Sequence, residues 1–209
     1  MSSNATISET GRVEAFSDGV FAIAITLLVL EVKIPTLGAV PLGLQLARQW
    51  PQYVSFVVAF MFIGIMWINH HRMFTHIKRS DTVLMLLNLL LLLGVTALPF
   101  PTAVLAAHLG QVDQRTAILL FNGTCGFIAI AFNVLWRYGV SKRGHLLGAG
   151  VDLESAQKIS RQYAFGPLLY IVCFALAYIN VLASLALNAG LACFFALPPQ
   201  VAVRHHREG

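Results

Sequence analysis

The chain has 209 residues, of which 57% are hydrophobic and only 11% are charged, and its mean hydropathy is +0.74. Soluble domains carry about 25% charged residues, so this chain has too few charges to cover a surface that faces water. The composition excludes an ordinary soluble enzyme, a disordered protein, a collagen-like fibre and a disulfide-rich secreted domain. It predicts an all-α, polytopic membrane protein.

The excess of basic residues fits a membrane protein better than a nucleic-acid-binding one. Fourteen Lys and Arg outnumber nine Asp and Glu, which gives a formal net charge of +5. The basic residues lie between apolar stretches, where they orient helices and contact anionic head groups. They lack the interleaved aromatic residues that bind nucleic acid. Cys125, Cys173 and Cys193 lie within apolar stretches, and we expect them to be small buried hydrophobic residues.

Stretches without charged residues place the membrane spans. A helix needs about 20 apolar residues to cross a bilayer, and the charge-free stretch 162–203 has 42. It therefore predicts two helices joined by a turn near 178–184. The expected helices are 12–34, 50–74, 82–107, 115–137, 161–179 and 182–202, which form a single six-helix transmembrane domain over 1–209.

The first expected span, 12–34, differs from the others because it carries charges. Its apolar centre covers only Val20 to Leu30, and Arg12 and Asp18 precede it. The acidic start and the lack of a cleavage site argue against a signal peptide. Spans that carry charges usually face the interior of a helix bundle or a water-filled path, so this helix is the candidate to line a pore.

Basic residues are distributed unevenly between the two sides of the membrane. Six spans place both termini on one side, where eleven Lys and Arg fall, against Lys33, Arg48 and Arg115 on the other. The positive-inside rule therefore predicts that both termini are cytoplasmic. Pro99 and Pro101 are expected to kink the third helix near its outer end.

Catalysis, metal binding and coupled transport find little support in the sequence. Nucleophilic catalysis needs Ser or Cys beside His and an acid, but the apolar core holds no acid after Asp18, so we expect neither an enzyme nor a cofactor. His70, His71 and His76 have no acidic ligand beside them, which favours hydrogen bonds to a neighbouring helix over a metal site. Coupled transport usually needs an ionisable residue near the middle of the bilayer, and spans two to six have none there.

A passive pore remains as a possible function. Because the filter sequence TVGYG is absent, whole helices would have to line such a pore. Ile23, Leu27 and Leu30 are spaced i, i+4, i+7 and therefore share one face of the first helix, with Thr26 beside them. This periodicity alone is typical of ordinary core packing. Repeated around a symmetry axis, the same stripe would form stacked apolar rings, which can gate a pore by dewetting.

Arg12 and Asp18 need partners, because an unpaired charge at membrane depth is costly. At six residues apart they do not face each other on a helix. We expect a network that joins Asp18 to a histidine and to the Trp67 indole, and so fixes the first helix against the second. The candidate partners at the inner end of the second helix are Trp67, Asn69, His70 and His71.

The segment 12–19 reads RxxxFSDG and resembles the signature of the transmembrane protein 175 family of potassium channels, which are endolysosomal in animals and have bacterial and archaeal relatives. The segment Trp67-x-x-His70-His71-x-x-Phe74 is also similar to that family. The resemblance implies a single-repeat prokaryotic member in the plasma membrane. It further implies a homotetramer whose pore is lined by the first helix of each subunit.

The resemblance also implies roles for particular residues. Ile23, Leu27 and Leu30 would form the constriction, with Thr26 as a polar contributor. The implied function is a passive potassium-permeable channel, modestly selective over sodium, whose partners are potassium ions and the lipid bilayer. A proton-conducting channel of the same architecture and a non-conducting structural or regulatory membrane protein are the alternatives. The implied inter-helix network, which would support the pore helix without binding ions, comprises Arg12, Phe16, Ser17, Asp18, Gly19, Trp67 and His70.

Overall fold

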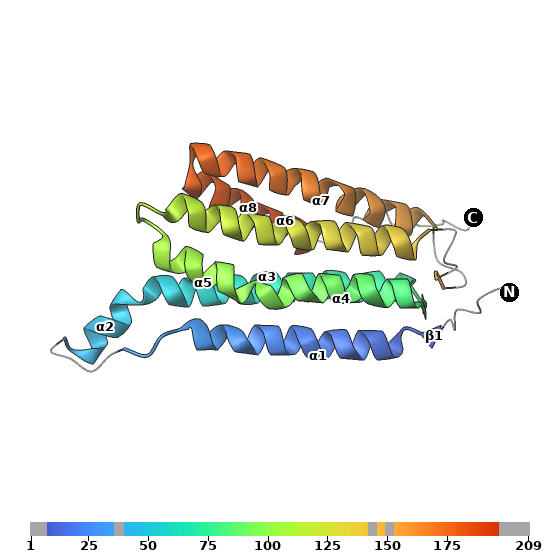
Figure 1. Cartoon of the computed structure of the whole chain (residues 1–209), viewed down its shortest axis with the longest axis horizontal. Coiled ribbons are helices and arrows are strands. Elements are labelled where there is room, and N and C mark those ends of the chain that lie inside the picture. Colours follow the sequence, from blue (N-terminus) through green and yellow to red (C-terminus); the bar gives the residue numbers. More distant parts are fainter. Residues whose placement is uncertain (1–7, 36–39, 142–145, 149–152, 197–209) are drawn as a thin grey trace, which may run out of the picture.

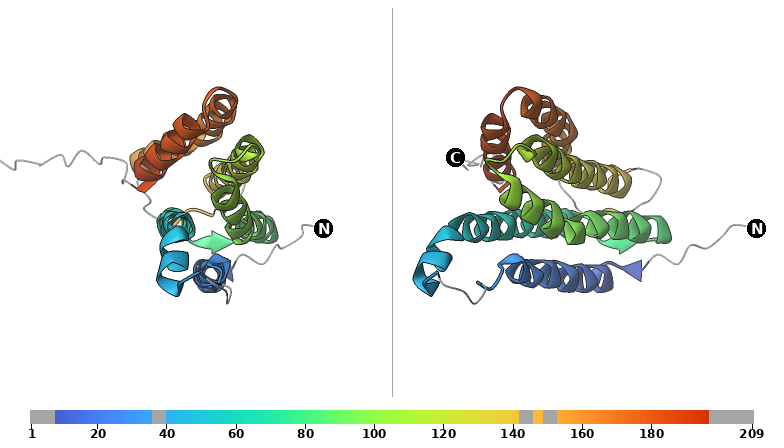
Figure 2. Two further views of the ribbon diagram at one scale, coloured as in Figure 1. Left: turned by 90° about the vertical axis from the view of Figure 1, so that its left-hand side faces the viewer. Right: turned by 60° about the vertical axis from the view of Figure 1, so that its left-hand side comes forward.

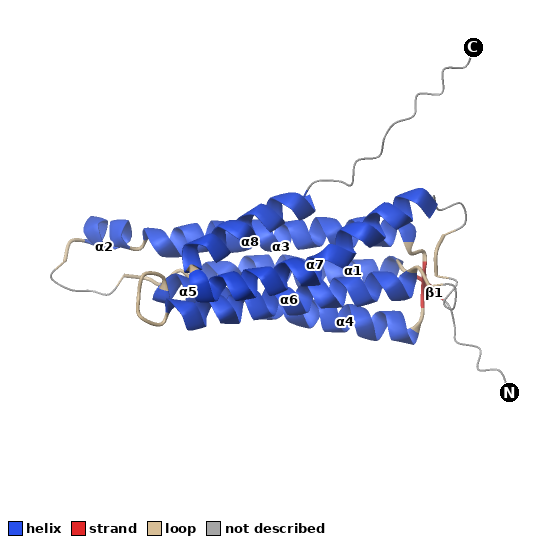
Figure 3. Cartoon of the chain, turned by 90° about the horizontal axis from the view of Figure 1, so that it is seen from above, coloured by secondary structure: helices blue, strands red, loops and turns tan. Residues whose placement is uncertain are grey.

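The computed structural model describes residues 8–35, 40–141, 146–148 and 153–196. These residues are almost wholly helical, and the helices run roughly along one common axis (Figure 3). The elements in chain order are β1 (Ser8–Glu9), α1 (Gly11–Leu27), the 3-10 helix η1 (Leu28–Glu31), α2 (Leu42–Arg48), α3 (Trp50–His76), β2 (Arg79–Ser80), α4 (Thr82–Ala97), α5 (Pro99–His108), α6 (Gln114–Gly139), α7 (Leu153–Ile179) and α8 (Val181–Ala196).

Five apolar helices in the described part of the chain are long enough to cross a membrane. They are α1 with η1, α3, α4 with α5, α6, and residues Ala156–Ile179 of α7, while the apolar α8 has only 16 residues. Leu98 keeps a helical backbone, so α4 and α5 form one span with a bend. The bend lies at Pro99 and Pro101, which lack backbone donors, and this confirms the predicted kink.

Two predicted helix boundaries are wrong. The fifth predicted helix, α7, begins at Leu153 and not at 161. Its first turns are polar, but they pack against α6, where the Trp136 indole donates to Ser160 Oγ at 2.8 Å. The first helix ends at Glu31 and not at 34, because helices usually stop before the residue that precedes a proline, here Pro35. The segment 197–202 of the sixth predicted helix lies outside the described residues.

The pore-helix candidate, α1, lies at one edge of the bundle (Figures 1 and 2). It packs mainly against α3 and α4, while α6, α7 and α8 form the opposite side. Side chains such as Ile63 of α3 and Leu84 of α4 are fully buried between these layers. One side of α1 is therefore left without a partner in the described chain.

A small hydrogen-bonded structure fixes the start of α1. Strand β1 pairs with β2 in antiparallel register, and β2 forms part of the link between α3 and α4. Next to β2, Ile77 forms a β-bridge with Leu147 of the α6–α7 connection, and the Lys78 and Arg79 amides donate to the Leu146 carbonyl. The sequence pattern did not predict these pairings, which join the segment before α1 to the α3–α4 and α6–α7 connections at one end of the bundle.

Buried amides hold the far side of the bundle together. Asn122 of α6 donates to Ser184 Oγ of α8 at 3.0 Å and to the Cys173 carbonyl of α7 at 3.0 Å. Asn188 of α8 donates to Asn122 Oδ1 at 2.8 Å. Such hydrogen bonds between helices stabilise packing within a bilayer.

The three cysteines do not all lie in the core. Cys125 and Cys173 are buried, as predicted, but Cys193 is exposed, so the prediction is wrong for that residue. The reason is that both the protein interior and the lipid are apolar. An apolar stretch therefore does not reveal which face of a membrane helix is buried.

Candidate functional site

The face of α1 that packs on the bundle is narrow. Ser17, Phe21, Ala24 and Leu28 are buried there, at the i, i+4, i+7, i+11 spacing of one helical face. Phe21 lies with its ring centroid 5.4 Å from that of His70 in α3. This stripe is what holds α1 against α3 and α4.

The predicted pore residues lie on a different face. Ile23, Leu27 and Leu30 are 59%, 48% and 73% exposed, respectively, so they take no part in the core of this chain. Thr26 is also exposed, and its hydroxyl donates to the Ile23 carbonyl at 2.9 Å. The stripe is thus free to meet lipid, water or other copies of the chain.

A chain of three buried polar side chains joins α1, α4 and α3. Asn88 Nδ2 donates to Ser17 Oγ at 2.9 Å, and Asn88 Oδ1 lies 2.9 Å from His70 Nε2. Because an amide oxygen only accepts, His70 carries its proton on Nε2. Ser17 in turn donates to the Val13 carbonyl at 2.7 Å. Each of these polar groups therefore finds a partner away from water.

A second hydrogen bond joins α1 and α3 at the neighbouring position. The Trp67 indole donates to Asp18 Oδ1 at 2.8 Å. The predicted network was wrong in detail, because it joined Asp18 to a histidine, whereas His70 bonds to Asn88. Successive helical residues point about 100° apart, so Ser17 and Asp18 reach different neighbours.

The three clustered histidines have separate environments. His70 is buried and stacks on Phe74 with ring centroids 4.6 Å apart, whereas His71 is exposed and stacks on Trp67 at 6.2 Å. His76 Nδ1 lies 3.0 Å from the Arg72 carbonyl. Among the described residues, no three His, Cys, Asp or Glu side chains lie where they could hold a metal ion.

Three residues of the RxxxFSDG segment lie outside this cluster. Arg12, Phe16 and Gly19 are exposed on α1, and Phe16 is 56% exposed. The structure therefore brings together Ser17, Asp18, Trp67 and His70. Of the residues predicted for the network, Arg12, Phe16 and Gly19 face away from α3 and α4.

Asn88 is the member of the cluster that the sequence analysis missed. It is 1% exposed and bonds to both Ser17 and His70. A sequence signal for it exists, since it is a lone amide inside an otherwise apolar run from Val83 to Leu93. Polar residues inside membrane helices usually face other helices.

Comparison with known proteins gives a clear family. The sequence profile described as endosomal/lysosomal potassium channel TMEM175 matches residues 12–99, which contain all but the first residue of α1 and all of α3 and α4. A potassium channel from Chamaesiphon minutus is 47% identical over 193 residues, which cover 91% of this chain and 95% of that protein. The chain belongs to the TMEM175 family. A potassium channel from Streptomyces collinus is 43% identical over 192 residues, which cover 90% of this TMEM175 chain and 92% of that relative.

Solved structures share the fold of this TMEM175 chain. The crystal structure of a lysosomal potassium-selective channel TMEM175 homologue from Chamaesiphon minutus matches with a TM-score of 0.81 and 44% identity, over 92% of this chain and 98% of that one. Animal relatives are more distant. The bovine endosomal/lysosomal proton channel TMEM175 is 30% identical over 164 residues, which cover 74% of this chain and 33% of that protein.

Proposed function

We propose that this TMEM175 chain forms a passive potassium channel, modestly selective over sodium, in a prokaryotic plasma membrane. Several copies, arranged as a homotetramer, surround a pore lined by α1. The observation that carries this proposal is the free apolar face of α1. Ile23 and Leu27 lie on that face, Leu30 continues it in η1, and all three are exposed in the single chain. Relatives named potassium channels, at 47% and 43% identity, support the choice of ion.

A single α1 cannot enclose a pore, so the proposal requires assembly. Copies of α1 around an axis place each apolar side chain in a ring with its equivalents. Such rings repel water when the pore is narrow and conduct when it widens. The constriction is therefore formed by Ile23, Leu27 and Leu30, and Thr26 adds a hydroxyl at its flank.

The polar cluster of Ser17, Asp18, Trp67, His70 and Asn88 supports the pore helix and does not bind ions. Ser17 and Asp18 hold the inner half of α1 to α3 and α4 through Asn88 and Trp67. Their side chains lie on α1 faces other than that of Ile23, since residues 17 and 23 point about 120° apart on a helix. The cluster thus fixes the rotation of α1, and with it the direction in which the constriction points.

The orientation of the chain follows from its charges. The start of α1, the link between α3 and α4, and the start of α7 lie at one end of the bundle (Figure 1). Arg72, Lys78 and Arg79 belong to this end, whereas Lys33 and Arg48 belong to the other. The positive-inside rule makes the basic end cytoplasmic.

Potassium efflux from liposomes that contain the purified protein tests this function. A passive potassium current stops when charge builds up, so efflux is expected to be small until a proton ionophore supplies a counter-current. When sodium replaces potassium inside the liposomes, sodium efflux is expected to be slower than potassium efflux but still measurable. If tetrameric protein gives no potassium efflux with or without the proton ionophore, but the liposomes take up protons without it, the protein is a proton channel. If neither potassium nor protons cross the membrane through tetrameric protein, the result contradicts a conducting role.

Thr26→Val is expected to reduce the preference for potassium over sodium. Thr26 is the sole hydroxyl in the apolar stretch Val20 to Leu30, and its oxygen keeps a free lone pair after donating to the Ile23 carbonyl. Valine has the same shape but offers no oxygen to a passing cation. The measurement is the reversal potential with potassium on one side and sodium on the other. An unchanged reversal potential removes Thr26 from the selectivity mechanism.

A further inference from the structure

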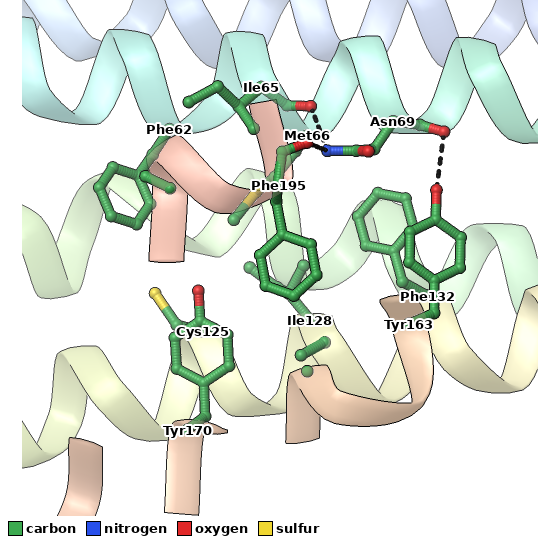
Figure 4. A pocket seen from close by; sticks show the side chains of 13 residues that line it. Phe62, Ile65, Met66, Asn69, Cys125, Ile128, Phe132, Tyr163, Tyr170 and Phe195 are labelled. Atoms are coloured by element: carbon green, nitrogen blue, oxygen red, sulfur yellow. Dashed lines mark hydrogen bonds between the residues drawn. The ribbon is translucent and has the colours of Figure 1, made fainter. Parts of the chain in front are cut away.

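A cavity lies between α3, α6, α7 and α8, on the side of α3 that faces away from α1 (Figure 4). Most of its lining residues are buried, and aromatic rings of Phe62, Phe132, Tyr163 and Phe195 form much of its wall. The cavity has a volume of about 60 Å³. One water needs roughly 10–15 Å³ by this measure, so the cavity accommodates a molecule of several heavy atoms.

The polar groups at the inner end of the cavity already have partners. Asn69 Nδ2 donates to the carbonyls of Ile65 and Phe195, at 2.9 and 3.0 Å. Asn69 Oδ1 accepts from Arg72 Nη1 at 3.4 Å, and the Tyr163 hydroxyl donates to the Asn69 carbonyl at 3.2 Å. This end therefore offers nothing to a charged or strongly polar ligand. Apolar cavities of this kind do not hold water.

The Tyr170 hydroxyl is the exception. Tyr170 of α7 is 7% exposed, and its hydroxyl points into the cavity beside Cys125 (Figure 4). It makes no hydrogen bond with any residue that the structure describes. The hydroxyl faces the open volume of the cavity, where a ligand oxygen can accept its proton.

We propose that this cavity binds a small membrane-soluble molecule that is mainly apolar and carries one hydrogen-bond-accepting oxygen, such as a short-chain alcohol or ketone. The apolar body lies against the aromatic wall, and the oxygen accepts from Tyr170. Access is from the lipid, along the seam of α3 and α8, where Ile65, Ala192 and Phe195 are half-buried. The site is separate from the pore stripe of α1, because α3 lies between them.

Photolabelling of the channel in liposomes with a diazirine derivative of butanol tests this site. Adducts are expected on α6 and α7 near Cys125 and Tyr170, and mass spectrometry of the digested protein locates them. Butanol and 2-butanone are expected to compete, whereas pentane, which lacks an oxygen, competes less well. Labelling of lipid-facing residues alone overturns the proposal.

Two variants and one matched control sharpen the test. Tyr170→Phe keeps the ring and removes the hydroxyl, so labelling is expected to fall about fivefold, which corresponds to one hydrogen bond. Ala192→Leu fills the cavity and is expected to abolish cavity labelling. Tyr178→Phe removes an exposed hydroxyl from the same helix and is expected to change nothing. Equal labelling of the parent, Tyr170→Phe and Ala192→Leu contradicts the site.

Discussion

Ile23→Asn is expected to raise potassium flux about tenfold, which corresponds to a barrier lower by about 1.4 kcal/mol. Ile23 is 59% exposed on the free face of α1, and we assign it to the constriction. An apolar ring excludes water, and an ion that crosses it loses hydration. The asparagine amide supplies donors and acceptors to water and to the ion, so the constriction stays wet. The measurement is potassium efflux from liposomes at matched amounts of assembled protein.

Val29→Asn is the matched control for this change. Val29, in η1, is 56% exposed, similar to Ile23, but it lies on a different side of the span. The same amide at Val29 is expected to leave the flux close to that of the parent. If Val29→Asn raises the flux and Ile23→Asn does not, a different face of α1 lines the pore.

His70→Leu is expected to lower the stability of the assembled protein by about 1–3 kcal/mol. His70 is 1% exposed, and its ring donates to Asn88 Oδ1. Leucine leaves that oxygen buried without a donor, which is the costly outcome. The measurement is the midpoint of thermal unfolding in detergent, followed by the loss of the intact assembly on size-exclusion chromatography.

The adjacent histidine provides the control. His71 is exposed, so His71→Leu is expected to shift the midpoint much less. The double variant His70→Leu, Asn88→Leu removes both partners and is expected to recover part of the loss, because no polar atom of that pair remains buried. Equal losses for His70→Leu and His71→Leu contradict the role of the buried chain.

The sequence predicted an almost wholly helical fold with several apolar spans because each one is a long apolar stretch bounded by charges. It also predicted that Asp18 and Trp67 lie together, although it joined Asp18 to the wrong second partner. The actual chain of bonds depends on Ser17 and Asn88, which are 71 residues apart. No local pattern reports which side chains meet over such a distance.

The faces of the helices were harder to predict than the helices themselves. The spacing of Ile23, Leu27 and Leu30 was equally typical of core packing, and the structure places all three outside the core. In a bilayer the surface that faces lipid is as apolar as the interior, so periodicity does not distinguish them. Cys193 was misplaced for the same reason.

The central claim is that potassium passes along the Ile23 face of α1, and silver block of Ile23→Cys tests it most directly. Silver is a monovalent cation that binds thiolates, as soft metals do. The parent, with Cys125, Cys173 and Cys193, and Val29→Cys serve as controls. We predict that silver abolishes potassium flux through Ile23→Cys and leaves both controls conducting. Continued flux through silver-treated Ile23→Cys, with block of Val29→Cys, would contradict the account.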